Sequence, residues 1–214
     1  FVRAGDAHVG IGRDRFEVGK KIPEADIFLL DDGFQHRRLA RTHDIVVIDA
    51  LDPLGGGVFP LGRLREPLSA LARADTIVIT RVQNGSAGIE KLVRKYNPRA
   101  AVFRSRVVPL HWIDFSTGKI AEGPFDRAAA FCGLGSPRSF WATLNELGIF
   151  PAERLAFPDH HRYRERDLAG LKSPLLLTTE KDAMNLPRGI SRKVYWLKIG
   201  IEIEREDELL HRIL

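Results

Sequence analysis

Short apolar runs rich in β-branched residues alternate along this chain with segments whose apolar residues are three and four positions apart. The first pattern predicts buried strands and the second predicts amphipathic helices. Their alternation favours an α/β fold, with a mostly parallel sheet and flanking helices, over an all-β fold or a helical bundle. The predicted strands are Ile27–Leu30, Ile45–Ile48, Thr76–Thr80, Ala101–Arg104, Ala129–Cys132, Leu175–Thr178 and Val194–Ile199.

The predicted helices lie between these strands. Leu68–Ala74 and Ile89–Tyr96 have the apolar spacing of a helix that packs on one face. A third helix is predicted after Ser136, a good N-cap, with Pro137 in the first turn and Gly148 as the stop.

A domain boundary is predicted where turn residues interrupt a weak extended pattern. Residues 110–119 alternate between apolar and polar and then turn, which is typical of a hairpin. We therefore expect two lobes, each with its own α/β layers: residues 1–104 and a smaller C-terminal lobe of residues 127–214, joined by a hinge or hairpin linker over residues 105–126.

The composition is that of a globular protein, with 44% hydrophobic and 29% charged residues. An excess of 33 basic over 28 acidic residues makes phosphates, nucleic acid and acidic lipid headgroups candidate partners. Nucleic acid is not expected, because no recognition helix or aromatic-basic sheet signature is present. The single cysteine, Cys132, stands among small apolar residues and is expected in the core. Because the chain begins with Phe1, we expect it to be the C-terminal portion of a longer protein.

The predicted strand Ile27–Leu30 runs directly into Asp31, Asp32 and Gly33. Two carboxylates at the end of an apolar strand are typical of a Walker B segment, where an aspartate helps to hold magnesium during phosphoryl transfer. The alternative is an ordinary turn, since Asp-Gly pairs commonly end strands. We favour the functional interpretation because a polar, basic loop, residues 35–38, follows.

A glycine-rich stretch follows the next predicted strand. Gly57 to Gly62 has the glycine spacing of a P-loop, but Arg63 and Leu64 stand where lysine and serine or threonine are required, so we interpret it as a flexible loop. Arg63 and Arg65 can point the same way from an extended segment and grip a phosphate or carboxylate. A solvated basic turn is equally compatible with the pattern, and the same two interpretations apply to Arg13 and Arg15.

Two further motifs carry polar chemistry. In Phe157–Tyr163 the residues Asp159 and His160 suit a general base or the group that tunes one, while a helix start capped by Asp159 is the alternative. A zinc site is not expected, since further ligands at fixed spacing are absent. Residues Thr178–Asp182 follow an apolar strand and either contact a nucleotide or cap the next helix.

Four motifs in this order resemble the tetraacyldisaccharide 4'-kinase family: residues 31–39, 62–68, 159–160 and 179–183. The resemblance implies a P-loop kinase core with a smaller C-terminal lobe joined by a two-stranded hinge. It also implies transfer of the γ-phosphate of ATP, with Mg²⁺, to the 4'-hydroxyl of an acylated disaccharide 1-phosphate in lipid A biosynthesis.

The resemblance also implies roles for individual residues. Asp31 and Asp32 would belong to the metal and active site, His36 would lie near the acceptor, and His160 would assist the catalytic base. Together with the local patterns, this makes the candidates Asp32, His36 and His160 for catalysis; Asp31, Lys181 and Asp182 for the cofactor; Arg13, Arg15, Gln35, Arg63 and Arg65 for the substrate; and Asp31 and Asp32 for the metal.

One departure from the family pattern matters. The family carries a glycine-lysine-threonine phosphate loop and a glycine-aspartate-glutamate motif upstream of the matched region, and Gly5-Asp6-Ala7 lacks the glutamate, so we do not assign Asp6 as the base. We expect a parent lipid kinase of which this chain is an inactive part; a non-catalytic phosphate- or phospholipid-binding module is the alternative. The other expectations are a monomer, the cytoplasmic face of the bacterial inner membrane, and peripheral membrane contact through a preceding segment.

Overall fold

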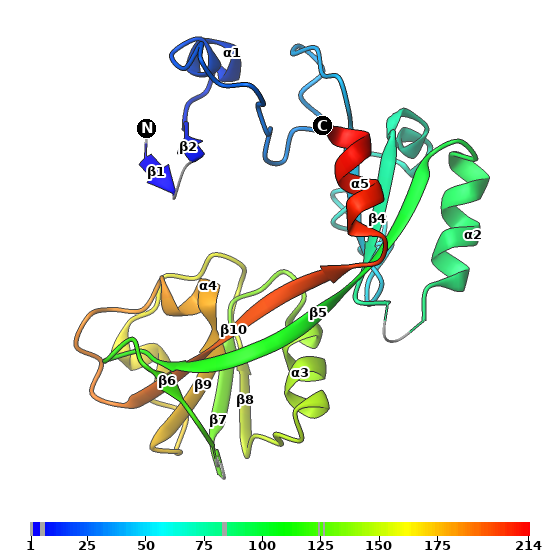
Figure 1. The fold of residues 1–214 in the computed structure, drawn as a ribbon. Helices are drawn as coiled ribbons and strands as arrows, with labels where there is room; N and C mark the ends of the chain where they lie inside the picture. The colour runs from blue at the N-terminus through cyan, green and yellow to red at the C-terminus, as the bar shows by residue number, and fades with distance from the viewer. Residues whose placement is uncertain (1, 5–6, 83–84, 124, 126) are drawn as a thin grey trace. The chain divides into compact units, whose positions relative to one another are not determined.

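The computed structural model describes residues 2–4, 7–82, 85–123, 125 and 127–214 (Figure 1). Gly5 and Asp6 of the motif considered above lie outside the described residues, as do Pro124 and Asp126 of the predicted linker. The helices and strands are β1 (Val2–Ala4), β2 (Ala7–Val9), α1 (Arg15–Gly19), β3 (Ile45–Asp49), the 3-10 helix η1 (Leu68–Arg73), β4 (Thr76–Thr80), α2 (Ala87–Tyr96), β5 (Ala101–Asp114), β6 (Ile120–Ala121), β7 (Ala129–Cys132), α3 (Pro137–Glu146), β8 (Glu153–Ala156), the 3-10 helix η3 (Glu165–Leu168), β9 (Leu175–Thr179), α4 (Glu180–Ala183), β10 (Lys193–Ile203) and α5 (Glu206–Ile213).

Contacts divide the chain into two compact units. The first consists of Phe1–Val47, Leu54–Val78 and Lys91–Val102, and the second of Ile48–Pro53, Ile79–Glu90 and Phe103–Leu214. The predicted linker, residues 105–126, therefore belongs to the second unit, because β5 pairs with β10 along most of its length. Its hairpin is present, since Trp112 pairs with Ala121 and Ile113 with Ile120. A hinge role stays a prediction.

The sheet of the second unit has the strand order β5-β10-β9-β7-β8, with β6 paired to β5. β10 and β9, β9 and β7, and β7 and β8 are parallel pairs, whereas β5 runs antiparallel to β10 and to β6. Crossover segments with helices join the parallel strands, as parallel pairing requires. The predicted α/β class with a mostly parallel sheet is confirmed.

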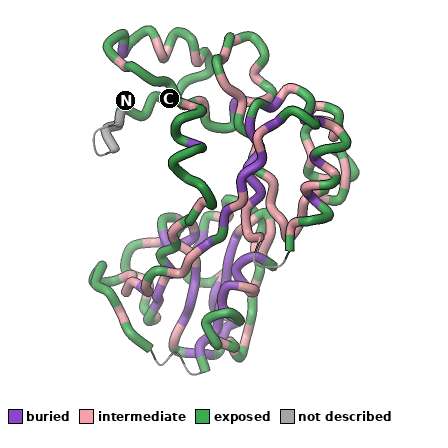
Figure 2. The backbone as a smooth tube through the Cα atoms, turned by 45° about the vertical axis from the view of Figure 1, so that its right-hand side comes forward, coloured by how far each residue is buried: buried purple, intermediate pink, exposed green. Residues whose placement is uncertain are grey.

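Each face of this sheet packs against a hydrophobic core, because side chains along each strand point alternately to the two faces. Ala130 and Cys132 of β7 point into a core with Phe140 and Leu144 of α3. Phe131, between them, points into a second core with residues of η3 and the following turn. The buried residues accordingly follow the strands (Figure 2). Burial of Cys132 confirms its predicted place in the core.

The predicted helices are present in two of three cases. α2 forms where the apolar spacing indicates, and α3 starts at Pro137 after Ser136, whose side chain makes no capping hydrogen bond. Gly148 follows α3 with a φ of 71°, the left-handed conformation that ends helices. The segment predicted as a helix at Leu68–Ala74 is the shorter 3-10 helix η1. Its carbonyls at Leu71 and Ala74 instead accept hydrogen bonds from the buried side chain of Asn97, at 2.8 and 2.7 Å.

The strand predicted at Ile27–Leu30 is not formed, and this prediction is wrong. These residues have no regular secondary structure, and the side chains of Ile27, Phe28 and Leu29 are exposed. An apolar run becomes a strand when neighbouring strands satisfy its backbone groups and cover its faces. Within the described part of the chain no strand pairs with this segment.

No helix in the described part of the chain combines the length and the apolar character that crossing a membrane requires.

Candidate functional site

The acid loop, residues 31–38, is the first part of the candidate site and belongs to the first unit. Asp31 and Asp32 are both exposed in a turn, and Asp32 has a φ of 52°. This left-handed conformation is uncommon for residues with a Cβ, although aspartate adopts it more readily than most. The two carboxylates therefore point from a tight turn rather than from the end of a strand.

The arginine segment, residues 62–66, lies against the acid loop. Its side chains alternate, with Arg63 and Arg65 exposed and Leu64 and Glu66 half-buried, as the extended pattern predicts. The guanidinium of Arg65 binds the Asp32 carboxylate at 2.5 Å. The structure thus brings together two groups that are 33 positions apart in the sequence, both predicted to belong to the site.

Glu66 also connects the two segments. Its carboxylate accepts hydrogen bonds from Arg37 of the acid loop and from Arg73 of η1, the latter at 2.6 Å. These two bonds, led by that from Arg73, hold the pKa of Glu66 below its ordinary value. The Arg73 guanidinium also lies 4.3 Å from the ring centre of Phe34. Sequence analysis missed Glu66 and Arg73, because their pairing depends on contacts between distant segments.

The remaining candidates of the acid loop differ in exposure. Gln35 is exposed, and His36 is half-buried. The backbone of His36 is held on both sides: its N–H donates to the Gly33 carbonyl at 2.8 Å, and its carbonyl accepts from Arg41 at 2.6 Å. The imidazole of His36 therefore projects from a turn whose backbone is fixed by hydrogen bonds.

The predicted arginine pair near the N-terminus lies at the start of α1. Arg13 is exposed, whereas Arg15 is half-buried with one guanidinium nitrogen that has no hydrogen-bond partner among the described residues. Asp14 caps the helix by accepting from the N–H groups of Phe16 and Glu17 at 3.0 and 3.1 Å. Arg13 and Arg15 do not contact the acid loop or the arginine segment through any described ion pair.

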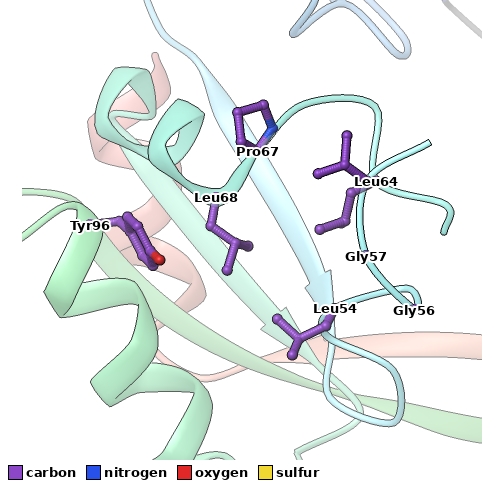
Figure 3. Close-up of a pocket in the computed structure, with 8 residues that line it drawn as sticks. Leu54, Gly56, Gly57, Leu64, Pro67, Leu68 and Tyr96 are labelled. Carbon is purple, nitrogen blue, oxygen red and sulfur yellow. The ribbon is translucent and has the colours of Figure 1, made fainter. Parts of the chain in front are cut away.

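An apolar hollow of about 460 Å³ lies beside the arginine segment, within the same unit. Figure 3 shows the side chains of Leu54, Leu64, Leu68 and Tyr96 around it. The polar loops described above and this apolar space therefore occur on one unit of the protein.

In the second unit, the loops that follow β7, β8 and β9 come together at the carboxyl edge of the parallel strands. Asp159 accepts a hydrogen bond from Lys181, which holds the pKa of Asp159 below its ordinary value. His160, beside it, has a φ of 58° and an exposed imidazole whose Nε2 is 3.8 Å from the Asp159 carboxylate. Asp159 is in a turn, so the alternative interpretation as a helix cap is wrong.

Asp182 is the buried centre of this loop cluster, with 1% of its surface exposed. One carboxylate oxygen accepts from the Gly133 N–H and the Tyr163 hydroxyl, both at 2.8 Å, and the other accepts from the Thr179 hydroxyl at 2.6 Å. Both oxygens are thus used by protein donors, which favours a structural role over the predicted contact with a cofactor. Thr179 caps α4, as one of the two sequence interpretations predicted.

The Asp182 carboxylate affects the pKa of Cys132 and limits the space at Gly133. Burial and the nearby carboxylate raise the pKa of Cys132 to about 12, so this thiol is not a nucleophile at neutral pH. A Cβ at Gly133 would lie 2.9 Å from the Tyr163 hydroxyl and 3.1 Å from Asp182, so this position accepts glycine alone. Tyr163, which sequence analysis did not assign, is identified by this contact.

The described residues do not contain a group of three or more histidine, cysteine, aspartate or glutamate side chains arranged to hold a metal. Protein-bound Mg²⁺ commonly uses one or two carboxylates and completes its octahedron with water and substrate phosphates. The adjacent, exposed carboxylates of Asp31 and Asp32 fit that smaller donor set.

The fold and these loops define an α/β protein with exposed arginines and carboxylates on its loops, residue types that can bind phosphate and metal. The family model described as tetraacyldisaccharide-1-P 4'-kinase, LpxK, matches residues 1–214. The chain belongs to this family.

Individual relatives agree. The chain is 38% identical over 208 residues to a tetraacyldisaccharide 4'-kinase of Halothermothrix orenii, covering 84% of this chain and 54% of the relative. It is 36% identical over 232 residues to one from Syntrophobacter fumaroxidans, covering 96% and 58%. A crystal structure of LpxK from Aquifex aeolicus in complex with ATP is similar with a TM-score of 0.61 and 30% identity, over 93% of this chain and 62% of that one. The chain thus spans little more than half the length of the curated relatives.

Proposed function

We propose that this chain is part of an ATP-dependent lipid kinase that phosphorylates the 4'-hydroxyl of a tetraacyldisaccharide 1-phosphate in lipid A biosynthesis. The observation that carries the proposal is the family match over residues 1–214. The ATP complex of the Aquifex aeolicus relative supports ATP as the phosphoryl donor.

The acid loop and the arginine segment supply the chemistry of this proposal. Arg63 and Arg65 are exposed on one side of their segment and suit the phosphate of the substrate, with Gln35 close by in the acid loop. Arg65 is held by Asp32, so it is oriented before a ligand arrives. His36 is placed near the acceptor in this proposal, and Arg13 and Arg15 are assigned to further phosphate contacts.

Mg²⁺ is the proposed metal, held by Asp31 with Asp32 beside it. When bound, it would neutralise negative charge on the phosphates of ATP. The protein residues do the positioning: the turn presents Asp31 to solvent, and the Arg65 ion pair fixes the neighbouring Asp32. His160 is proposed to assist the catalytic base and Lys181 to contact the nucleotide, both from the second unit.

The lipid substrate is the proposed partner, and the cytoplasmic face of the bacterial inner membrane is the proposed location. The acylated substrate that the family description names supports the lipid as partner. A monomer is the proposed state.

The test is phosphoryl transfer from radiolabelled ATP to a tetraacyldisaccharide 1-phosphate. It should be run with residues 1–214 and with the protein made from the complete open reading frame that encodes them. A labelled 4'-phosphate product from the complete protein, abolished by chelation of Mg²⁺, supports the proposal. Absence of that product under conditions in which the Aquifex aeolicus enzyme works would overturn it.

A further inference from the structure

The glycine-rich loop, residues 54–64, is closed by its own backbone hydrogen bonds. The N–H groups of Gly57, Phe59, Leu61, Arg63 and Leu64 donate to carbonyls within the loop, at 2.7 to 3.1 Å. A Cβ at Gly62 would lie 2.2 Å from the Gly57 carbonyl oxygen, so the chain crosses itself at a point that accepts glycine alone. The flexible loop of the sequence interpretation is thus a defined, hydrogen-bonded structure.

This loop holds two large apolar side chains in solvent. Phe59 is 76% exposed and Leu61 is 93% exposed, while Leu64 in the same loop faces the apolar hollow. A loop that only connects two elements gains nothing from displaying phenylalanine and leucine, because exposed apolar surface is unfavourable in water. The loop tip, residues 59–61, therefore fits an apolar environment outside the protein.

Two observations identify that environment. The backbone donors of the loop are used internally, so the tip offers little for a strand of another polypeptide to pair with. Exposed arginines accompany the tip: Arg63 and Arg65 follow it in sequence, and Arg37 and Arg38 belong to the acid loop that Arg65 contacts. Arg65 is paired with Asp32 and Arg37 with Glu66, and the four arginines outnumber these two carboxylates. Exposed apolar side chains followed in the chain by exposed arginines match a bilayer, in which anionic headgroups overlie acyl chains.

We propose that the loop tip, residues 59–61, inserts into the surface of an anionic lipid bilayer, with the neighbouring arginines binding the headgroups. This differs from the expectation of membrane contact through a preceding segment. It stands on the loop geometry and does not require phosphoryl transfer, so it can fail while the proposed kinase function holds.

The experiment is cosedimentation of residues 1–214 with vesicles. One vesicle preparation is phosphatidylcholine with about one third phosphatidylglycerol, and the other is phosphatidylcholine alone. We expect binding to the anionic vesicles that weakens as salt is raised, because salt screens the arginine–headgroup attraction. We expect the double variant Phe59→Ser, Leu61→Ser to lower the partition coefficient by about tenfold or more.

The matched control is Phe150→Ser in the second unit, where Phe150 is 73% exposed. It removes the same side chain at similar exposure and should leave binding unchanged. Circular dichroism and thermal melting of each variant establish that it is folded. Failure of the wild-type chain to bind, equal binding by the double variant, or equal loss in the control would each overturn the proposal.

A second variant tests insertion directly. Tryptophan fluorescence of Leu61→Trp should be quenched by brominated acyl chains in the anionic vesicles beyond the quenching of the native tryptophans. Phe150→Trp should show no added quenching. Quenching that is equal in the two variants would place the loop tip outside the bilayer, and would contradict the proposal even if the protein sediments with vesicles.

Discussion

At the scale of single residues, buried or bridging carboxylates hold the candidate site together. Asp182 accepts hydrogen bonds from Gly133, Tyr163 and Thr179, and so joins the loops at the carboxyl edge of the sheet. Glu66 does the same for the acid loop and η1 through Arg37 and Arg73. Both residues act through the groups they position, whereas the Asp31 side chain is exposed in the acid loop.

Replacing Asp182 with alanine should lower the free energy of unfolding by about 3 to 5 kcal/mol, because two buried donors and the half-buried Thr179 hydroxyl lose their acceptor. Tyr163→Phe removes one of these hydrogen bonds and should cost only about 1 kcal/mol. Asp182→Asn should fall between the two. Urea denaturation of the three variants provides the measurement. Equal, small losses in all three would show that Asp182 does not organise the loop cluster.

The Asp159–Lys181 pair gives a pH dependence whose sign is set by the lowered pKa of Asp159. A lowered folded-state pKa means that the contribution to stability is present above the ordinary value of 3.8 and is lost as pH falls through the folded-state pKa. Lys181→Gln should raise the pKa of Asp159 toward its ordinary value, and His160→Gln should raise it less. Carboxyl NMR titration measures both. A larger rise in the His160 variant would contradict this assignment.

At the scale of elements, the apolar segments that form β7 and β9 are buried on both faces, whereas the predicted strand that does not form is exposed. β7 and β9 have neighbouring strands on each side and helical or loop cover above and below. Ile27–Leu30 is equally apolar but has neither within the described residues, and stays exposed. Apolar character therefore indicated where a strand could form, while pairing decided whether it did.

Two glycines in different elements should respond oppositely to alanine. Gly62→Ala places a Cβ 2.2 Å from the Gly57 carbonyl oxygen and should disrupt the glycine-rich loop. Gly88 of α2 has no atom within 4 Å of such a Cβ, so Gly88→Ala should stabilise the protein by up to about 1 kcal/mol. Hydrogen exchange of the Phe59 and Leu64 amides should accelerate in the Gly62 variant alone. Unchanged protection there would refute the closed loop.

At the scale of the whole molecule, the candidate groups fall on two units of the chain. The acid loop and the arginine segment belong to the first, and the cluster around Asp182 and His160 belongs to the second. The order of motifs along the sequence was enough to identify the family, and the family match covers both units.

If Asp31 holds the metal, Asp31→Asn should lower kcat by about two or more orders of magnitude. The variant is made in the complete protein encoded by the open reading frame. Folding should be unaffected because the Asp31 side chain is exposed. Asp26→Asn, an exposed carboxylate five positions earlier, is the matched control and should be neutral. The kinase assay and thermal melting measure the two effects. Near-normal turnover of the Asp31 variant would remove it from the metal site.

Local periodicity and motifs that are continuous in the chain were sufficient to predict the α/β class, six of the seven proposed strands, two of the three proposed helices and the family. Tertiary structure decided what depends on distant partners. Among the described residues no strand pairs with Ile27–Leu30, whereas Arg65 binds Asp32 and the buried Asp182 accepts hydrogen bonds from Gly133, Tyr163 and Thr179. The fold decides which donors and acceptors pair and which apolar side chains are covered. These partners are distant in the sequence, so no local pattern specifies them.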